Sequence, residues 1–131
     1  MEDNSLARLD SLWGSMLARV MVSKDQRQGS VFSPMHWNDF VAAKGRVNSL
    51  VNPTVDPISG QPESKNTPVK ISPYYPAWHG FILSRQQKKP STEYWVQIKG
   101  QQFWRYELAG ATIIGDPSIW ARQQLNDEVS A

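Results

Sequence analysis

The sequence predicts a mainly β protein with short helices and a single longer helix near the C-terminus. Several short segments alternate apolar and polar residues with a period of two, which is typical of half-buried strands. The chain carries 9 Pro and 8 Gly among 131 residues, and these residues interrupt long helices. One helix start is well marked, because Asp116 can cap the helix N-terminus and Pro117 suits its first turn. We expect this C-terminal helix to run to about Asn126.

The expected strands follow one another along the chain. Gly14 suits a tight turn between the first two strands. Pro34 ends or bends the third, because proline has no N–H to donate to a sheet. Residues 103–108 are apolar enough for either a strand or a helix. The expected strands cover residues 6–11, 16–23, 30–32, 67–72, 80–84 and 94–99.

Residues 35–64 form a long segment with weak periodicity and many turn residues. A loop of this length inside a compact domain is usually either functional or disordered. The segment keeps large apolar side chains, among them Trp37 and Leu50, which a disordered linker tends to lack. We therefore interpret it as a functional loop, with one short helix through Asn48–Val51.

The composition argues against several classes of function. The net charge is only +2, from 14 basic and 12 acidic residues, which is a weak footprint for a general nucleic-acid binder. The absence of cysteine excludes disulfides, thiolate nucleophiles and cysteine-bound iron–sulfur clusters within this chain. No segment approaches the roughly 20 apolar residues that span a bilayer, and the N-terminus lacks a signal-peptide pattern. We expect a cytoplasmic protein that contacts neither nucleic acid nor membrane.

The sequence offers no recognisable catalytic centre. His36 and His79 are far apart and lack the short spacing of a metal-ligand pair. Asp39 and Asp56 could join His36 only through a fold that the spacing does not specify, so a hydrogen-bonded structural role is the default for His36. Phosphate-cradling glycine motifs, nucleophile elbows and evident acid/base pairs of carboxylates are missing. We therefore predict no catalytic residue and no metal ligand.

One polar segment has the side chains to hold a ligand. Gly45-Arg46-Val47-Asn48 precedes the run Asp56–Lys65, so guanidinium, amide, hydroxyl and ammonium groups lie beside glycine and proline turns. Lysine supplies a point charge for phosphate, and an asparagine amide can both donate to and accept from a base or pterin edge. These groups suit a phosphorylated, guanine-containing ligand. The alternative is a set of solvated loop residues in which Asn48 caps a helix.

Several segments, taken in order, carry a family resemblance. They are Asp25–Trp37, Gly45–Leu50, Asp56–Lys65, Ala77–Arg85 and Phe103–Gly110. Together, over about residues 6–110, they resemble the C-terminal domain of molybdenum oxidoreductases that carry bis-molybdopterin guanine dinucleotide. Pro-Met-His-Trp-Asn at Pro34–Asn38 and Ser-Gly-Gln-Pro-Glu-Ser-Lys at Ser59–Lys65 are similar to assimilatory nitrate reductases in particular.

The resemblance implies a fold and a division of the chain. In the family this domain is a double-psi β-barrel, so the implied fold here is a partial double-psi β-barrel over residues 1–73. A C-terminal extension over residues 74–131 would pack on the barrel or follow it. The family's barrel begins with strands that this chain lacks, and exposed strand edges can pair between chains. The implied partners are therefore the remainder of a nitrate reductase catalytic chain, or a second copy in a homodimer.

The resemblance also implies a cofactor site. Carried onto this sequence, Asn48 and Lys65 are cofactor contacts, with Arg46 as a partner, while His36 and Trp37 line the approach to cofactor or substrate. The cofactor would be bis-molybdopterin guanine dinucleotide with molybdenum in the intact enzyme, and we expect none to bind this chain alone. The intact enzyme would reduce nitrate to nitrite, and this part alone would not catalyse.

Two alternatives stay open at this point. The same domain occurs in formate dehydrogenases and other molybdopterin oxidoreductases, which differ in sequence outside this region. A different class is a free-standing binding module that uses an aromatic surface around Trp78, Trp95 and Trp104. It predicts a complete, closed core.

Overall fold

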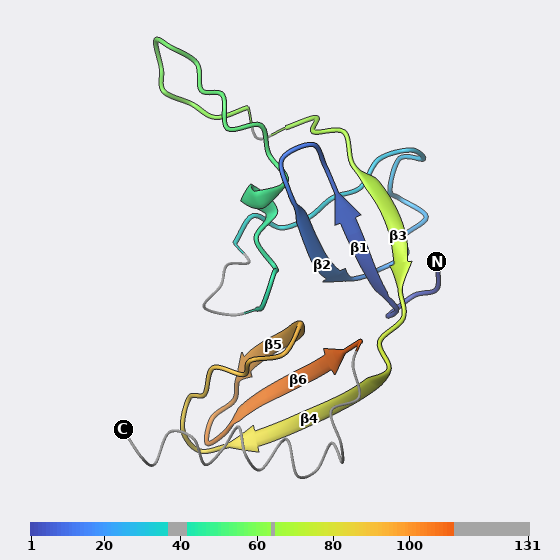
Figure 1. Ribbon diagram of the computed structural model, residues 1–131, viewed down its shortest axis with the longest axis vertical. Helices are drawn as coiled ribbons and strands as arrows, with labels where there is room; N and C mark the ends of the chain where they lie inside the picture. The colour runs from blue at the N-terminus through green and yellow to red at the C-terminus, as the bar shows by residue number, and fades with distance from the viewer. Residues whose placement is uncertain (37–41, 64, 112–131) are drawn as a thin grey trace. The chain divides into compact units, whose positions relative to one another are not determined.

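A computed structural model describes residues 1–36, 42–63 and 65–111 of the chain. It divides into two compact units, the first drawn from Met1–Phe40 and Lys44–Tyr74 and the second from Val41–Ala43 and Tyr75–Ala131. The described residues contain six strands and one short 3-10 helix, so the predicted mainly β class is confirmed (Figure 1). Each unit is built around one antiparallel sheet of three strands.

The first sheet has the strand order β2-β1-β3. Asp10 lies opposite Ser15 of the second strand and Lys70 of the third, so these three residues mark one end of the sheet, here called the Asp10 end. Leu6 lies opposite Arg19 and Tyr74 at the other end. The strands are β1 (Leu6–Asp10), β2 (Ser15–Arg19) and β3 (Lys70–Tyr74).

One face of the first sheet forms its core. Alternate residues of a strand point to the same face, so Ala7 and Leu9 of β1 line up with Met16 of β2. Leu50 completes this buried cluster and comes from the turn that follows the 3-10 helix η1 (Val47–Ser49). Burying a leucine side chain contributes about 1.5–3 kcal/mol. The core of the sheet therefore also fixes η1.

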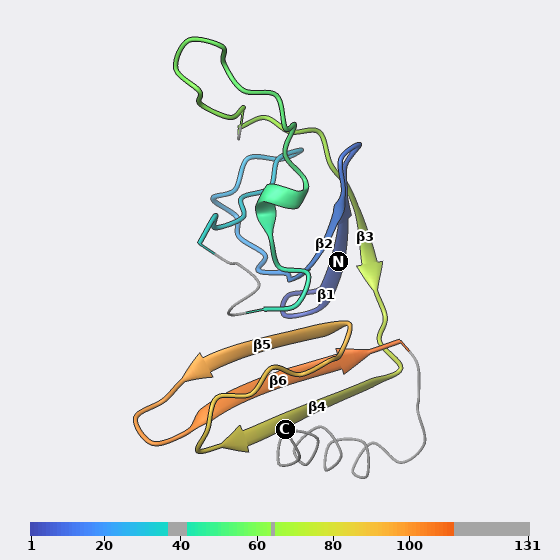
Figure 2. The same cartoon turned by 60° about the vertical axis from the view of Figure 1, so that its left-hand side comes forward.

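The second sheet has the strand order β4-β6-β5, with β6 in the centre (Figures 1 and 2). Its core combines buried Ile82, Trp95, Tyr106 and Leu108. Residues 103–108, which the sequence left open between strand and helix, lie mostly in β6, because neighbours on both sides satisfy its backbone. The strands are β4 (Trp78–Ser84), β5 (Tyr94–Lys99) and β6 (Trp104–Gly110).

The tryptophans of the second unit belong to this core. Trp95 is only 3% exposed. Trp78 and Trp104 are partly buried and pack against the same cluster. The three side chains therefore pack against the core of the sheet.

The strand predicted over residues 30–32 is wrong. A strand needs a neighbour to take up its backbone groups, whereas this segment bonds locally. The Ser30 N–H donates to Arg27 O at 3.2 Å, and Gly29 adopts a φ of 78°. The predicted polar turn at 25–29 thus extends through Ser30, and residues 31–34 contain no strand.

Two other boundaries differ from the prediction for identifiable reasons. The predicted strand over 16–23 ends at Arg19, because Asn4 turns the chain with a φ of 62° directly after Asn4 and Ser5 have bonded to the backbone of Val20. The predicted strand over 67–72 instead runs from Lys70 to Tyr74 and includes Pro73. Proline is tolerated there because β3 is an edge strand of this sheet.

Some expectations lie beyond what the structure tests. The predicted helix from Asp116 to Asn126 lies outside the described residues. The partial double-psi barrel and the boundary between residues 73 and 74 stay predictions. Across the described parts of the chain, no helix has the length and apolar character needed to cross a membrane.

Candidate functional site

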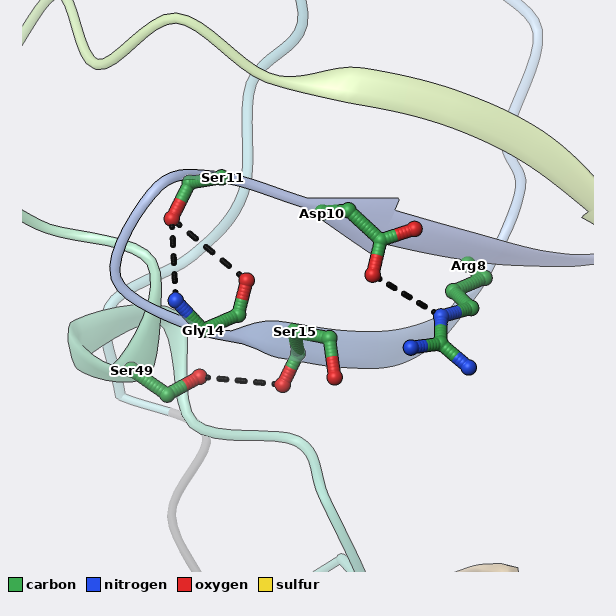
Figure 3. A network of polar contacts seen from close by, with 6 residues as sticks. All are labelled: Arg8, Asp10, Ser11, Gly14, Ser15 and Ser49. Atoms are coloured by element: carbon green, nitrogen blue, oxygen red, sulfur yellow. Dashed lines mark hydrogen bonds and ion pairs between the residues drawn. The ribbon is translucent and has the colours of Figure 1, made fainter.

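Residues 44–50 lie along the outer edge of β2, on the side away from β1. The Leu17 N–H donates to Lys44 O at 3.1 Å. The hydroxyl Oγ of Ser49 lies 3.2 Å from Ser15 O (Figure 3). It also lies 2.7 Å from Arg46 O, so both carbonyls compete for its one proton. Since Ser15 begins β2, these contacts hold η1 at the Asp10 end of the first sheet.

The tip of the β1–β2 hairpin supports the same turn. The Ser11 hydroxyl accepts hydrogen bonds from the N–H groups of Trp13 and Gly14, at 3.1 and 3.2 Å. A Cβ atom on Gly14 would stand 2.4 Å from Ser49 O, which no real contact allows. Figure 3 shows the hairpin tip and Ser49 side by side. Glycine at position 14 therefore allows the backbones of the hairpin tip and of Ser49 to approach each other closely, in addition to its place in the turn.

The side chains of the η1 turn alternate between the core and the solvent. Val47 packs against the core cluster of the first sheet, and Leu50 is part of that cluster. Arg46 and Asn48 are exposed. The Leu50 N–H donates to Val47 O at 2.9 Å and closes the 3-10 turn. The sequence Arg-Val-Asn-Ser-Leu thus presents a guanidinium and an amide on a backbone that is anchored on both sides.

The run Asp56–Lys65 begins as an ordered loop. Val55 pairs with Pro62 in an isolated antiparallel bridge, and the Asp56 N–H donates to Gln61 O at 2.9 Å. The Gly60 N–H donates to Asp56 O at 2.8 Å, and Gly60 has a φ of 68°, which favours glycine. Figures 1 and 2 show this segment, in green, extending away from the first sheet.

The Asp56 carboxylate orders the start of this loop. Its Oδ1 accepts the Ser59 N–H at 2.7 Å, the Ser59 hydroxyl at 2.9 Å and the Ile58 N–H at 3.0 Å. These donors, with the Ser59 N–H as the largest cause, lower the pKa of Asp56 below its ordinary value. This carboxylate is therefore engaged within its own loop.

Lys65 is exposed and shortly precedes β3 in the chain. Only residues 66–69 separate it from Lys70, the first residue of β3. An extended chain spans at most about 3.6 Å per residue, so the Cα atom of Lys65 lies within roughly 18 Å of that of Lys70. The placement of Lys65 beside Arg46 and Asn48 stays a prediction.

The other two predicted site residues are His36 and Trp37. His36 is exposed and lies in a turn. It follows a segment that leaves the sheet at Arg19, opposite the Asp10 end. Within the described residues, no contact links His36 to Asn48 or Lys65. Trp37 lies outside the described residues.

Neither histidine belongs to a cluster that could hold a metal. Across residues 1–36, 42–63 and 65–111, no group of three His, Cys, Asp or Glu side chains comes together. Asp56, which the sequence analysis considered beside His36, directs its carboxylate to Ser59 and Ile58.

Sequence reasoning missed Ser49 and the second role of Gly14. Ser15 and Ser49 are 34 positions apart, so no local pattern connects them. A weak signal exists at Gly14: the residue has no positive φ, so its turn alone does not require glycine. Only the packing of the hairpin tip against residue 49 explains it.

Comparisons with known proteins identify the family of the chain. Residues 1–68 match the model of a family described as "Molydopterin dinucleotide binding domain", and the chain belongs to this family. No solved structure gives a significant match.

Several nitrate reductases are similar to the chain. It is 43% identical to "Nitrate reductase" of Klebsiella oxytoca over 124 residues, which are 93% of this chain and 14% of that protein. It is 43% identical to "Nitrate reductase" of Synechocystis sp. over 46% of this chain and 8% of that protein. It is 35% identical to "Assimilatory nitrate reductase catalytic subunit" of Bacillus subtilis over 55% of this chain and 10% of that protein. The chain thus spans a small part of these relatives' length.

The residues at the Asp10 end fit the dinucleotide that the family name implies. Phosphate needs cationic partners, which Arg46 and Lys65 supply from exposed positions. A guanine or pterin edge needs a group that donates and accepts, which the exposed Asn48 amide provides. Asp56, the carboxylate that begins the same loop, is engaged with Ser59.

Proposed function

We propose that this chain is the part of an assimilatory nitrate reductase that holds one arm of bis-molybdopterin guanine dinucleotide. The observation that carries the proposal is the anchored turn that exposes Arg46 and Asn48 on the first unit, which also carries the exposed Lys65. The family of the chain and the names of its relatives support it. The proposed parent enzyme is cytoplasmic, which is consistent with a chain that contains no cysteine.

In this proposal the protein binds and orients, and the cofactor supplies the two-electron chemistry that reduces nitrate to nitrite. Asn48 donates to and accepts from the edge of guanine or pterin. Lys65 neutralises phosphate charge, and Arg46 can offer two parallel N–H groups to a phosphate. His36 and Trp37 line the approach to the cofactor. The molybdenum ligand and the electron path come from other parts of the enzyme.

The upstream reading frame distinguishes the proposal from its alternatives. We expect the DNA directly 5′ of the codon for Met1 to continue in frame into a molybdopterin oxidoreductase with the metal-ligand motif of a nitrate reductase. A frame with the corresponding motif of a formate dehydrogenase would assign formate, in place of nitrate, as the substrate of the parent enzyme. A stop codon with no oxidoreductase frame would contradict the proposal and favour a free-standing module.

Cofactor retention by the full-length enzyme tests the site. Asn48→Ala and Lys65→Ala should each lower the molybdenum and guanine nucleotide content of the purified enzyme, because each removes a polar partner worth about 1–3 kcal/mol when charge-assisted. The matched control is Lys24→Ala, since Lys24 is also an exposed lysine of the first unit. Wild-type cofactor content in both site variants would overturn the site assignment.

Asn48→Asp separates the chemistry of Asn48 from its shape. The aspartate side chain has the same size but loses both N–H donors and adds a negative charge beside phosphate. We expect Asn48→Asp to lose at least as much cofactor as Asn48→Ala, while the thermal stability of the enzyme without cofactor stays unchanged. Full cofactor retention by Asn48→Asp would show that Asn48 donates no hydrogen bond to the ligand.

A further inference from the structure

We propose that Gly14 and Ser49 are positioning residues, which hold the η1 turn so that Asn48 meets the cofactor in one fixed orientation. This inference rests on the proposed function and names the residues that make the site rigid. Neither residue is a ligand contact in this account. They act through Asn48, which precedes Ser49 in the chain.

The first reason is that η1 is too short to hold itself. It comprises only Val47–Ser49, and an isolated turn of this length is marginal, because its few hydrogen bonds do not repay the entropy of ordering the backbone. Its conformation must therefore come from contacts outside the turn. Two contacts tie this part of the chain to β2: the Leu17 N–H donates to Lys44 O, three residues before η1, and the Ser49 hydroxyl lies 3.2 Å from Ser15 O.

The second reason is the close approach at Gly14. Ser49 O occupies the space in which a side chain of residue 14 would begin, 2.4 Å from an ideal Cβ. Any larger residue must move the Ser49 carbonyl, and Asn48 moves with it. The Ser11 hydroxyl accepts the Gly14 N–H at 3.2 Å and limits how far the hairpin tip itself can give way.

The third reason is the hydroxyl of Ser49. It lies within hydrogen-bond distance of Arg46 O, within the turn, and of Ser15 O, at the start of β2. One side chain thus joins the turn that carries Arg46 and Asn48 to the sheet. Because Val47 and Leu50 already bury the apolar side of the turn, the hydroxyl adds orientation more than burial.

The test measures the rate at which the full-length enzyme releases its cofactor into excess apo-acceptor. We expect Ser49→Ala to raise this rate by about 5–10-fold, the equivalent of one hydrogen bond. Ser49→Thr, which keeps a hydroxyl, should restore most of the retention. Gly14→Ala should release cofactor at least as fast as Ser49→Ala. The matched control is Gly80→Ala, because a Cβ on Gly80 would meet its nearest atom at an ordinary 3.6 Å.

A double substitution separates positioning from a general loss of stability. If Ser49 acts through Asn48, then Ser49→Ala in an Asn48→Ala background adds no further release. An additive effect overturns the inference, as does wild-type release by Ser49→Ala. If Gly14→Ala does not fold, the Ser49 variants carry the test alone. If Asn48→Ala releases cofactor at the wild-type rate, the proposed function fails. If Asn48→Ala releases cofactor fast but Ser49→Ala has no effect, only the positioning role of Ser49 is overturned.

Discussion

Asp56 orders an exposed loop through its carboxylate. Its Oδ1 accepts three hydrogen bonds from Ile58 and Ser59, in the pattern by which aspartate commonly fixes a turn. The loop therefore holds a defined conformation although Ile58 at its tip is 95% exposed. A loop that is already ordered loses less entropy when it meets a partner or a ligand.

Removing this carboxylate should release the loop and leave the sheet intact. In Asp56→Ala we expect the amides of Ile58 and Ser59 to exchange with solvent several-fold faster, because both lose their acceptor. Asp25→Ala, at another exposed aspartate in a polar turn, is the control. Hydrogen exchange followed by NMR measures the effect. Unchanged exchange at Ser59 would mean that the loop does not depend on Asp56.

The lowered pKa of Asp56 gives this loop a defined pH dependence. Because the folded loop favours the ionised carboxylate, its contribution to loop stability is complete above the unfolded pKa and is lost as pH falls through the lowered, folded pKa. At neutral pH the carboxylate is therefore ionised, and its contribution to the loop is complete. In an NMR titration the Ser59 amide should respond with a midpoint below about 3.9, the value of a free aspartate. A midpoint at or above that value would contradict the account.

Residue types were easier to predict than residue partners. The exposed Asn48 and Lys65 stood out because of their motif and chemistry, but the contact between Ser15 and Ser49 joins segments 34 positions apart. Such a contact depends on the register of a hairpin and on the docking of a loop. Alternation of apolar residues within either segment carries no information about it.

Among the elements, η1 depends most clearly on others. Its anchor is Leu50, which is 4% exposed and packs with Ala7, Leu9 and Met16. The turn therefore joins the hydrophobic core directly to the residues proposed to hold the cofactor. Loss of this anchor should affect both stability and binding.

We expect Leu50→Ala to destabilise the full-length enzyme by about 2–5 kcal/mol, since it leaves a cavity in a small core. It should also lower cofactor retention, because the turn loses its apolar anchor. Leu12→Ala is the matched control, as Leu12 is 92% exposed and surface changes usually stay within about 0.5 kcal/mol. Chemical denaturation measures the first effect and molybdenum content the second. Equal stability of the two variants would show that Leu50 does not anchor the turn.

Strands were predicted correctly where apolar and polar residues alternate clearly. They were predicted wrongly where the presence of a neighbouring strand determines the structure. The segments that became β1, β4 and β5 show clear patterns, and their predicted positions agree within a few residues. Residues 30–32 have a strand-like composition but no neighbouring strand. The shift of β3 to include Pro73 follows from its place at a sheet edge, which the sequence alone does not reveal.

At the scale of the whole molecule, the first unit exposes many large apolar side chains. Phe32 is 80% exposed and Met21 is 85% exposed, and both lie outside the strands. Exposed apolar side chains mark contact with another protein where they form a contiguous patch. In the proposed function, the remainder of the nitrate reductase chain covers these side chains. The double-psi barrel that the resemblance implies stays a prediction.

The 131-residue chain on its own should therefore associate with itself and bind cofactor poorly. β3 and β4 are edge strands of their sheets, so pairing between copies has available sites. Sedimentation velocity over a tenfold range of concentration should show a mass that rises with concentration. A strict monomer over that range would contradict the prediction, and tight binding of the isolated dinucleotide cofactor would contradict the expected loss of affinity.

The most direct test of the central claim is a cryo-electron microscopy structure of the full-length enzyme with its cofactor bound. The account predicts that the Asn48 amide and the Lys65 ammonium group lie within hydrogen-bond distance of the same dinucleotide arm, at the Asp10 end of the first sheet. A structure in which both side chains face solvent while the cofactor contacts other parts of this chain would contradict it.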